Sequence, residues 1–292
     1  MDTVGRLDVP LAIGDYTGEQ NVPQYSIAEN YSLDTFVQHG GKLSYGTSVM
    51  ESIMNTATSD DPVAIIEIAP ATSLGNVLLR NPGISKNCLC VAMSGSIYHG
   101  YRNSSSPSAE YNVVQNITSA QAMYNATWLS PLATAPLDTT VFMQFMATTP
   151  LGPGPYADLL LANLTNNHIF ASTLLANYEA WYNGGGKGYS AILPFTPTTG
   201  TSTLYDALAA YMTGVYGNWR LSLSTNSTGS SPPPFPFVTT ENLPVLVNGQ
   251  GYTIITSPGM AQPVYPAINF PDGMNIDINE IANDIVSSII GA

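Results

Sequence analysis

A glycine-rich stretch, WYNGGGKGYS at residues 181–190, is the first candidate for chemistry, because glycine loops that contain a lysine can bind phosphate. A P-loop needs the spacing G-x-x-x-x-G-K-[ST] between a strand and a helix. Here Lys187 is followed by Gly188, and the residues before the glycines have helical periodicity. The stretch therefore predicts the end of a helix and a flexible connection rather than a nucleotide site.

Two aspartates form the other candidate for catalysis. Asp34 in SLDTF and Asp138 in PLDTT repeat the sequence Leu-Asp-Thr. Acid proteases of the pepsin type use two aspartates that share one proton, each in a hydrophobic-Asp-Thr-Gly turn. Neither stretch has the glycine that shapes this turn. Asp34 and Asp138 are therefore kept only as the catalytic pair of an alternative hypothesis, a secreted acid-stable hydrolase.

Other reactive side chains give weaker signals. Ser94 in VAMSGS lacks the flanking glycines of a nucleophile elbow, and the three histidines share no short metal-ligand spacing. Cys88 and Cys90 would lie on one face of a strand, where a disulfide between them would be strained. The sequence predicts buried free thiols, no metal site and no cofactor.

The composition is unusual in its low charge. Charged residues make up 9% of the 292 residues, the net charge is −13, and Lys and Arg together number 7. A nucleic-acid backbone or an anionic membrane surface needs clustered cations, so we expect neither partner. A surface built from hydroxyl and amide groups keeps its hydrogen bonds at low pH, which favours an acidic exterior. The N-terminus has neither the basic nor the apolar region of a signal peptide.

Sequons of the form N-x-[ST] are no more frequent than the high Asn, Ser and Thr content would give by chance. Their positions are more useful, because a sugar needs an exposed loop. Asn103 and Asn226 lie in polar stretches and are the first glycosylation candidates, and Asn116 and Asn125 are the next.

The first half of the chain reads as β structure and the middle as helix. Glycine, serine, asparagine and proline clusters separate runs of strand length. We expect a hairpin within 36–46 and strands within 62–70, 88–101 and 139–149. We also expect a helix over 156–182 with a break at 165–167, a second helix from Thr203 to Gly217, and a hairpin over 243–256. The predicted fold is mainly β, a β-sandwich that carries inserted helices and a short C-terminal helix.

Domain boundaries follow from a proline-rich segment. We expect a β-rich domain at 1–226 with a helical insertion at about 156–217, a linker at 227–237, and a hairpin plus helix at 238–292. The last helix has an apolar stripe, which packs on its own domain or contacts another subunit or a membrane, and its acidic polar face disfavours the membrane. Its members are the candidate assembly contacts: Ile278, Ile281, Ile285 and Ile289.

In its low charge, its many Tyr, Ser, Thr and Asn residues and its proline-rich loops, the chain resembles the capsid and surface proteins of acidophilic hyperthermophilic archaea and their viruses. The resemblance is one of composition only, so it identifies no functional residues. It implies a β-sandwich of the jelly-roll type with helices inserted between strands. It also implies a self-assembling, non-enzymatic structural protein of a virion or an extracellular layer, in contact with its own copies and other proteins of the same assembly. A carbohydrate-binding or adhesion module that uses aromatics such as Trp181, Trp219 or Tyr101 is a further alternative.

Overall fold

The computed structural model describes residues 5–15, 32–150, 152–166, 168–186, 194–215, 243–268 and 278–291. Its centre is a six-stranded mixed sheet with the order β3-β4-β5-β10-β8-β9. The strands are β3 (Val63–Glu67), β4 (Cys88–Ala92), β5 (Leu132–Thr134), β8 (Leu243–Val247), β9 (Thr253–Ile255) and β10 (Pro263–Pro266). Neighbours among β3, β4, β5 and β10 are parallel, and β8 and β9 are antiparallel. The predicted β-sandwich is therefore wrong.

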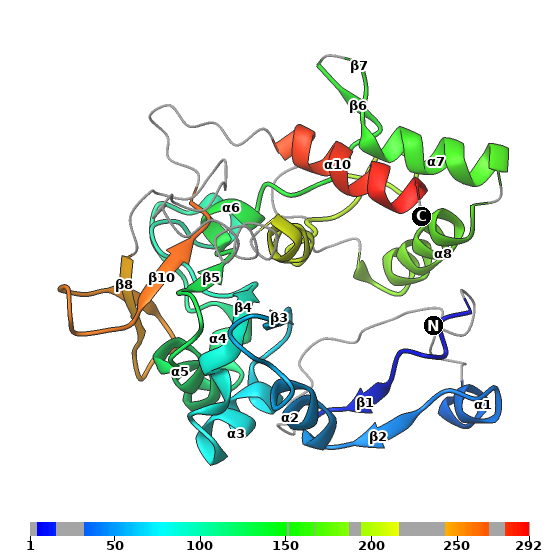
Figure 1. Ribbon diagram of the computed structural model, residues 1–292. Helices are drawn as coiled ribbons and strands as arrows, with labels where there is room; N and C mark the ends of the chain where they lie inside the picture. The colour runs from blue at the N-terminus through cyan, green and yellow to red at the C-terminus, as the bar shows by residue number, and fades with distance from the viewer. Residues whose placement is uncertain are drawn as a thin grey trace.

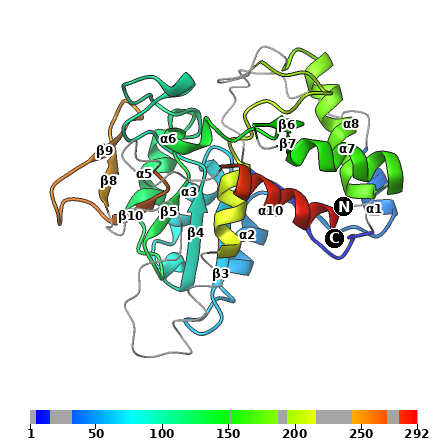
Figure 2. The same cartoon turned by 90° about the horizontal axis from the view of Figure 1, so that it is seen from above.

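The parallel part of the sheet is built by a strand–helix–strand unit. Strand β3 leads into α3 (Thr72–Arg80) and the short helix η2 (Ile84–Asn87), and the chain then returns as β4. Every residue of β4 is buried, as expected for a parallel strand with both faces covered. Helix α3 packs against α5 (Ile117–Asn125) on one side of the sheet (Figures 1 and 2).

A second group of helices covers the other side of the sheet. It consists of α7 (Pro155–Asn166), α8 (Ile169–Asn183), α10 (Ile278–Ile290) and the helical residues 207–215. The break between α7 and α8 and the helix end at Gly184 confirm the sequence prediction. Ile281 is buried in this group, and Ile278, Ile285 and Ile289 pack against it, so the apolar stripe of α10 faces its own chain.

Two of the predicted strands have a different structure. Residues 36–46 were expected to form a hairpin, but they contain the end of α1 (Leu33–Gln38) and β2 (Leu43–Tyr45), which pairs in parallel with β1 (Leu11–Ile13). Residues 139–149 begin in α6 (Leu137–Thr140) and continue as an extended segment. That segment is mostly buried up to Phe145, and it contacts residues 199–201 through an isolated bridge without entering the central sheet.

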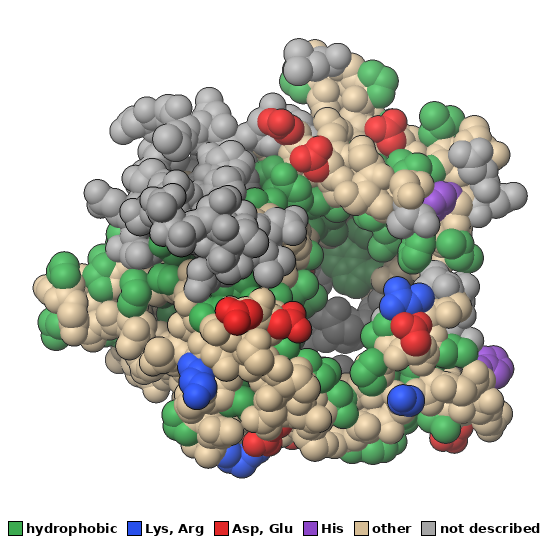
Figure 3. All heavy atoms as spheres, in the orientation of Figure 1, with side chains coloured by type: hydrophobic (Ala, Val, Ile, Leu, Met, Phe, Trp, Pro, Cys, Tyr) green, Lys and Arg blue, Asp and Glu red, His purple; other side chains and the backbone are tan. Residues whose placement is uncertain are grey.

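The remaining elements are short. They are α2 (Ser48–Met54), η3 (Tyr101–Asn103), α4 (Tyr111–Val114), β6 (Thr148–Thr149) and β7 (Gly152–Pro153). Strands β8 and β9 form the hairpin predicted within 243–256, and they join the same sheet as β3 to β5 through β10. Figure 3 shows that one face of the molecule is hollowed between α8 and α10 on one side and β1 and β2 on the other. Within the described residues, no helix is both long and apolar enough to cross a membrane.

Candidate active site at the carboxyl ends of the parallel strands

The carboxyl ends of β3, β4 and β5 lie along one edge of the sheet. In open α/β sheets, ligands bind in the crevice outside this edge. Beyond β4 the chain makes a long connection, residues 93–110, before it enters α4. This connection and the segment before the 207–215 helix bring together the acidic and aromatic side chains that form the candidate site.

Glu110 is a deeply buried acid of this edge, with 2% of its surface exposed. It is the N-cap of α4, where its Oε1 accepts the Asn112 N–H at 2.8 Å. Its Oε2 accepts the Gly95 N–H at 3.2 Å, directly after β4. Burial raises the pKa of the Glu110 carboxyl to about 7, although these backbone N–H groups lower it, and the charge of Asp206 raises it further. Glu110 is therefore half protonated near neutral pH.

Asn112 fixes the same segment to the end of β4. Its Nδ2 donates to the backbone oxygen of Met93 at 3.0 Å. Residues 110 and 112 are therefore both attached to the turn that follows β4, one through a carboxylate and the other through an amide. The sequence SAEYN is typical of a polar loop, and the buried position of Glu110 and the half-buried position of Asn112 become visible only in the folded chain.

Asp206 is the second acid of the site and lies at the start of the 207–215 helix, where its backbone oxygen accepts the Ala210 N–H. Its side chain reaches solvent, but the surrounding protein raises its pKa to about 6 by desolvation. Because Asp206 acts on the pKa of Glu110, the two carboxyl groups lie within electrostatic range. At neutral pH the exposed Asp206 is mainly ionised, and the buried Glu110 is partly protonated.

Two tyrosines lie beside this acid pair. The rings of Tyr101 and Tyr205 meet edge to face, with 6.4 Å between their centroids. The Tyr101 hydroxyl accepts the Tyr111 N–H at 2.8 Å, which joins the loop tip to α4. Burial raises the pKa of both phenols, and the Glu110 charge adds to the rise in each. The site thus combines two carboxyls with an aromatic pair.

The tip of the loop next to Tyr101 has a left-handed backbone. Arg102 and Asn103 have φ angles of 57° and 54°. Residues other than glycine rarely adopt this backbone conformation, which costs roughly 1–2 kcal/mol per residue. Arg102 is close enough to lower the pKa of Tyr205. A positive charge therefore stands beside the aromatic pair at the exposed end of the site.

A third acid, Asp15, follows β1 and contacts the start of α3. Its N–H donates to Ser73 Oγ at 2.8 Å, and its Oδ2 accepts the Asn76 amide at 2.6 Å. Gly14 permits this approach, since a Cβ at that position would lie 2.5 Å from Ser73 Oγ. Asp15 therefore belongs to the same carboxyl-end edge as the β3–α3 connection.

The two aspartates predicted as a catalytic pair are separated by the fold. Asp34 lies on the exposed helix α1, where its N–H donates to Ser32 Oγ. Asp138 is buried after β5, with 1% of its surface exposed, and both of its oxygens accept backbone N–H groups. A proton-sharing pair needs two carboxyls in contact, so the aspartic-protease hypothesis has no support in this structure.

The other predicted residues lie outside the site, with one exception. Tyr101, named as a sugar platform, is part of it, whereas Trp181 stacks on Tyr178 in α8. The sequon residues Asn103 and Asn125 are exposed, Asn116 caps α5, and Asn226, Trp219 and Lys187 lie outside the described residues. Cys88 and Cys90 are buried and free, as predicted. Within the described residues, no three His, Cys, Asp or Glu side chains group closely enough to hold a metal ion.

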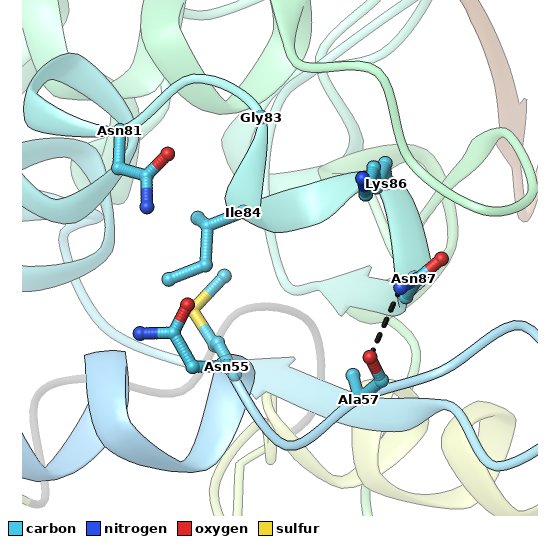
Figure 4. Close-up of a pocket in the computed structure, with 8 residues that line it drawn as sticks. Asn55, Ala57, Asn81, Gly83, Ile84, Lys86 and Asn87 are labelled. Atoms are coloured by element: carbon cyan, nitrogen blue, oxygen red, sulfur yellow. Dashed lines mark hydrogen bonds between the residues drawn. The ribbon is translucent and has the colours of Figure 1, made fainter.

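A separate depression of about 310 Å³ lies near the opposite, amino end of the strands. Figure 4 shows Asn55 and Asn81 beside Ile84 there, with Asn87 bonded to the backbone oxygen of Ala57. Asn55 and Asn81 are the C-caps of α2 and α3, so two helix carboxyl ends meet at this depression. Its lining has neither acids nor aromatics, and Lys86 is its one charged residue.

The fold and the site define an α/β protein with an acid pair at the carboxyl edge of its parallel strands, and solved structures share this fold. An inosine-guanosine nucleoside hydrolase matches 99% of this chain and 84% of its own, with a TM-score of 0.63 and 15% identity. An inosine-uridine preferring nucleoside hydrolase from Bacillus anthracis matches 96% and 79%, with a TM-score of 0.52 and 13% identity. The chain spans 65% of a purine-preferring ribonucleoside hydrolase from Gardnerella vaginalis, with a TM-score of 0.54 and 17% identity.

One more solved structure shares the fold, whereas the comparisons of sequence found no match. The type III effector protein XopQ, solved in complex with adenosine diphosphate ribose, matches 99% of this chain with a TM-score of 0.50 and 14% identity. No protein-family model and no curated protein sequence matches the chain. The likeness is therefore one of fold, at identities too low to transfer an activity.

These findings correct the functional predictions from composition. The self-assembling capsid or surface protein, the absence of enzyme character, and the virion or acidic-exterior location are all contradicted by a fold that the chain shares with nucleoside hydrolases. Contacts with copies of itself, and the lack of nucleic-acid or membrane partners, remain predictions. The small number of charged residues reflects the composition of the solvent-facing surface. It gives no information on the buried acids at the strand ends.

Proposed function

We propose that the chain binds a ribonucleoside at the carboxyl edge of β4 and hydrolyses its N-glycosidic bond. The observation that carries the proposal is the coincidence of this fold, matched over 99% of the chain by an inosine-guanosine nucleoside hydrolase, with a carboxyl pair at the edge where such sheets bind ligands. In the reaction, water adds to C1′ of the ribose, the C–N bond breaks, and the base leaves with a proton.

The two carboxyls have different protonation states, which suits this reaction. Glycoside hydrolysis uses one carboxylic acid to protonate the leaving group and one carboxylate to activate water. With a pKa of about 6 and access to solvent, Asp206 is ionised at neutral pH and can accept a proton from water. With a pKa of about 7, Glu110 keeps a share of the acid form and can donate to the leaving base or a ribose hydroxyl.

The neighbouring groups can orient the substrate. The Tyr101–Tyr205 pair offers an aromatic surface for a base, because flat π systems stack or meet edge to face. Arg102, near Tyr205 at the exposed end, can take a phosphate or a polar group of the base. The Glu110 carboxyl can accept a hydrogen bond from a ribose hydroxyl with a remaining lone pair.

The test is release of free base, measured by chromatography after incubation with inosine, guanosine, adenosine and uridine at pH 5 to 8. We expect hydrolysis of at least one nucleoside, and a loss of roughly 100-fold or more in Glu110→Gln and in Asp206→Asn, because acid–base groups contribute about that much. Glu51→Gln is the matched control, since Glu51 lies on α2 in an ion pair with Arg80. No base release from any of the four would contradict the proposal.

Binding without cleavage is the second candidate, favoured by the fold likeness to the effector solved with adenosine diphosphate ribose. Calorimetry with adenosine diphosphate ribose and adenosine decides between the two. Binding that is weakened by Glu110→Gln, together with no base release, would replace hydrolysis by binding. Cleavage that depends on Glu110 and Asp206 would exclude the binding-only function.

A further inference from the structure

Asp138 is a buried carboxylate that the proposed reaction does not use. It stands at the start of α6, directly after β5, and its carboxylate accepts hydrogen bonds from the connection that follows the neighbouring strand β4. Its Oδ2 accepts the Ile97 N–H at 2.7 Å, and its Oδ1 accepts the Tyr98 and His99 N–H groups at 2.7 and 3.0 Å. Hydrogen bonds to an ionised group are roughly twice as strong as neutral ones. Asp138 thus holds three consecutive backbone groups in one turn.

This turn is connected by further hydrogen bonds to the segment that carries Glu110. The Ser96 hydroxyl donates to the His99 oxygen at 2.7 Å and accepts the Ser108 N–H at 2.8 Å. Ser108 stands two residues before Glu110. On the other side of the turn, the Gly95 N–H donates to Glu110 itself. The position of the Glu110 carboxyl therefore depends on this turn through two links, the Ser96–Ser108 hydrogen bond and the Gly95–Glu110 hydrogen bond.

The loop has little room to adopt another shape. A Cβ on Gly100 would lie 2.1 Å from Ser108 Oγ, so the segments around residues 100 and 108 are in close contact. Thr253 of β9 adds a fixed point, because its Oγ1 accepts the Ser96 N–H at 2.9 Å and donates to the Ser96 oxygen at 2.8 Å. A charge that anchors residues 97–99 can therefore set the geometry of the whole connection.

We propose that Asp138 is a positioning residue, which fixes the turn at residues 97–99 so that Glu110 is presented to the ribonucleoside. The inference rests on the proposed function for its kinetic test. Asp138 contacts neither substrate nor reacting atoms in this scheme. Its effect passes through Ser96 and Ser108 to Glu110.

A matched control is the next residue in the chain. Thr139 is equally buried, lies on the same helix α6, and its Oγ1 donates to the Ala267 oxygen at 2.7 Å, after β10. Thr139→Val removes a buried hydrogen bond without touching residues 97–99. Asp138→Asn keeps the shape of the side chain but turns an amide N–H₂ toward a backbone N–H. A general loss of packing around α6 would affect both variants alike.

The experiment measures kcat/KM for the best nucleoside in the wild type, Asp138→Asn, Thr139→Val, Glu110→Gln, and the double variants of Glu110→Gln with each of the other two. We expect Asp138→Asn to lose about 10-fold or more and Thr139→Val less than about 3-fold. Combined with Glu110→Gln, Asp138→Asn should add less than about 2-fold, because residues that act through one group are non-additive. Thr139→Val should keep its full separate effect in the double variant.

Hydrogen exchange of the amides at residues 95 and 97–99 is measured in parallel. We expect faster exchange in Asp138→Asn, including at Gly95, and unchanged exchange there in Thr139→Val. Additive kinetic losses, or unchanged exchange at Gly95, would overturn the positioning role. If the wild type releases no base, the proposed function fails, and exchange at Gly95 alone decides the inference. If Asp138→Asn does not fold, Ser96→Ala takes its place in the same cycle, with the same outcomes.

Discussion

The pH dependence of stability follows directly from the buried Glu110. Its pKa rises from an ordinary 4.5 to about 7 because burial penalises the charged form. The folded state therefore binds more protons than the unfolded state between these two pH values. Under this condition the free energy of unfolding falls as pH rises. The contribution of Glu110 to the free energy of unfolding is fully present below pH 4.5 and is lost as the pH rises through 7.

The size of the effect follows from the same pKa change. At about 1.4 kcal/mol per pKa unit, a rise from 4.5 to about 7 corresponds to a loss of about 3 kcal/mol between acid and neutral pH. Glu110 has 2% of its surface exposed, so solvent screens little of this penalty. In Glu110→Gln a neutral amide replaces the acid at every pH. We expect the variant to gain about 3 kcal/mol relative to the wild type between pH 4.5 and 8.

Urea unfolding at half-unit steps from pH 4 to 8 measures this difference, with circular dichroism to establish the folded baseline at each step. Other titrating groups are common to both proteins and cancel in the comparison. Asp206→Asn serves as a second check, because it removes a charge that raises the pKa of Glu110 and should move the decline to lower pH. A wild type and a Glu110→Gln variant with parallel stability curves would refute the assignment of Glu110 as a desolvated acid.

Two further predictions concern the packing of the sheet. Gly75→Ala should lower the free energy of unfolding by about 1–3 kcal/mol in urea unfolding, because a Cβ there would lie 2.3 Å from Ser119 Cβ and force α3 away from α5; equal stability would show that the two helices can separate freely. Cys88 and Cys90 should not react with a thiol reagent in the native protein and should react fully in urea, because both are buried and burial raises the pKa of each thiol. Rapid labelling of either thiol in the native protein would contradict the burial of β4.

Local sequence signals predicted those parts of the fold that depend on local interactions. The helical period and the polar break at Thr165-Asn166-Asn167 located α7 and α8, and the Asn-Gly turn located the β8–β9 hairpin. The run CLCVA predicted a strand, but an uninterrupted apolar run does not show whether its neighbours are parallel or antiparallel. The amphipathic segment 72–80 between β3 and β4 carried that information, since a helix between two successive strands indicates a parallel crossover.

The site was less predictable because its chemistry arises from burial. Glu110 has no special local sequence, and only contacts with Gly95 and Asn112 identify it as a desolvated acid. Asp138 attracted attention through a short repeat, yet its carboxylate is fully used by backbone N–H groups. Neither the desolvation of Glu110 nor the backbone hydrogen bonds of Asp138 can be predicted without the path of the β4–α4 connection. A motif search favours residues with recognisable neighbours in sequence, whereas pKa values depend on neighbours in space.

The scarcity of cations has a different meaning once the site is known. Carboxyls in protein sites are commonly held ionised by a nearby Lys or Arg, which lowers their pKa. Among the described residues, the groups that change the pKa of Glu110 and Asp206 include no cation, so desolvation remains uncompensated. The two values of about 7 and about 6 then lie near neutral pH, where proton transfer in both directions is efficient. The composition that predicted a chemically inert building block thus favours an acid pair suited to catalysis.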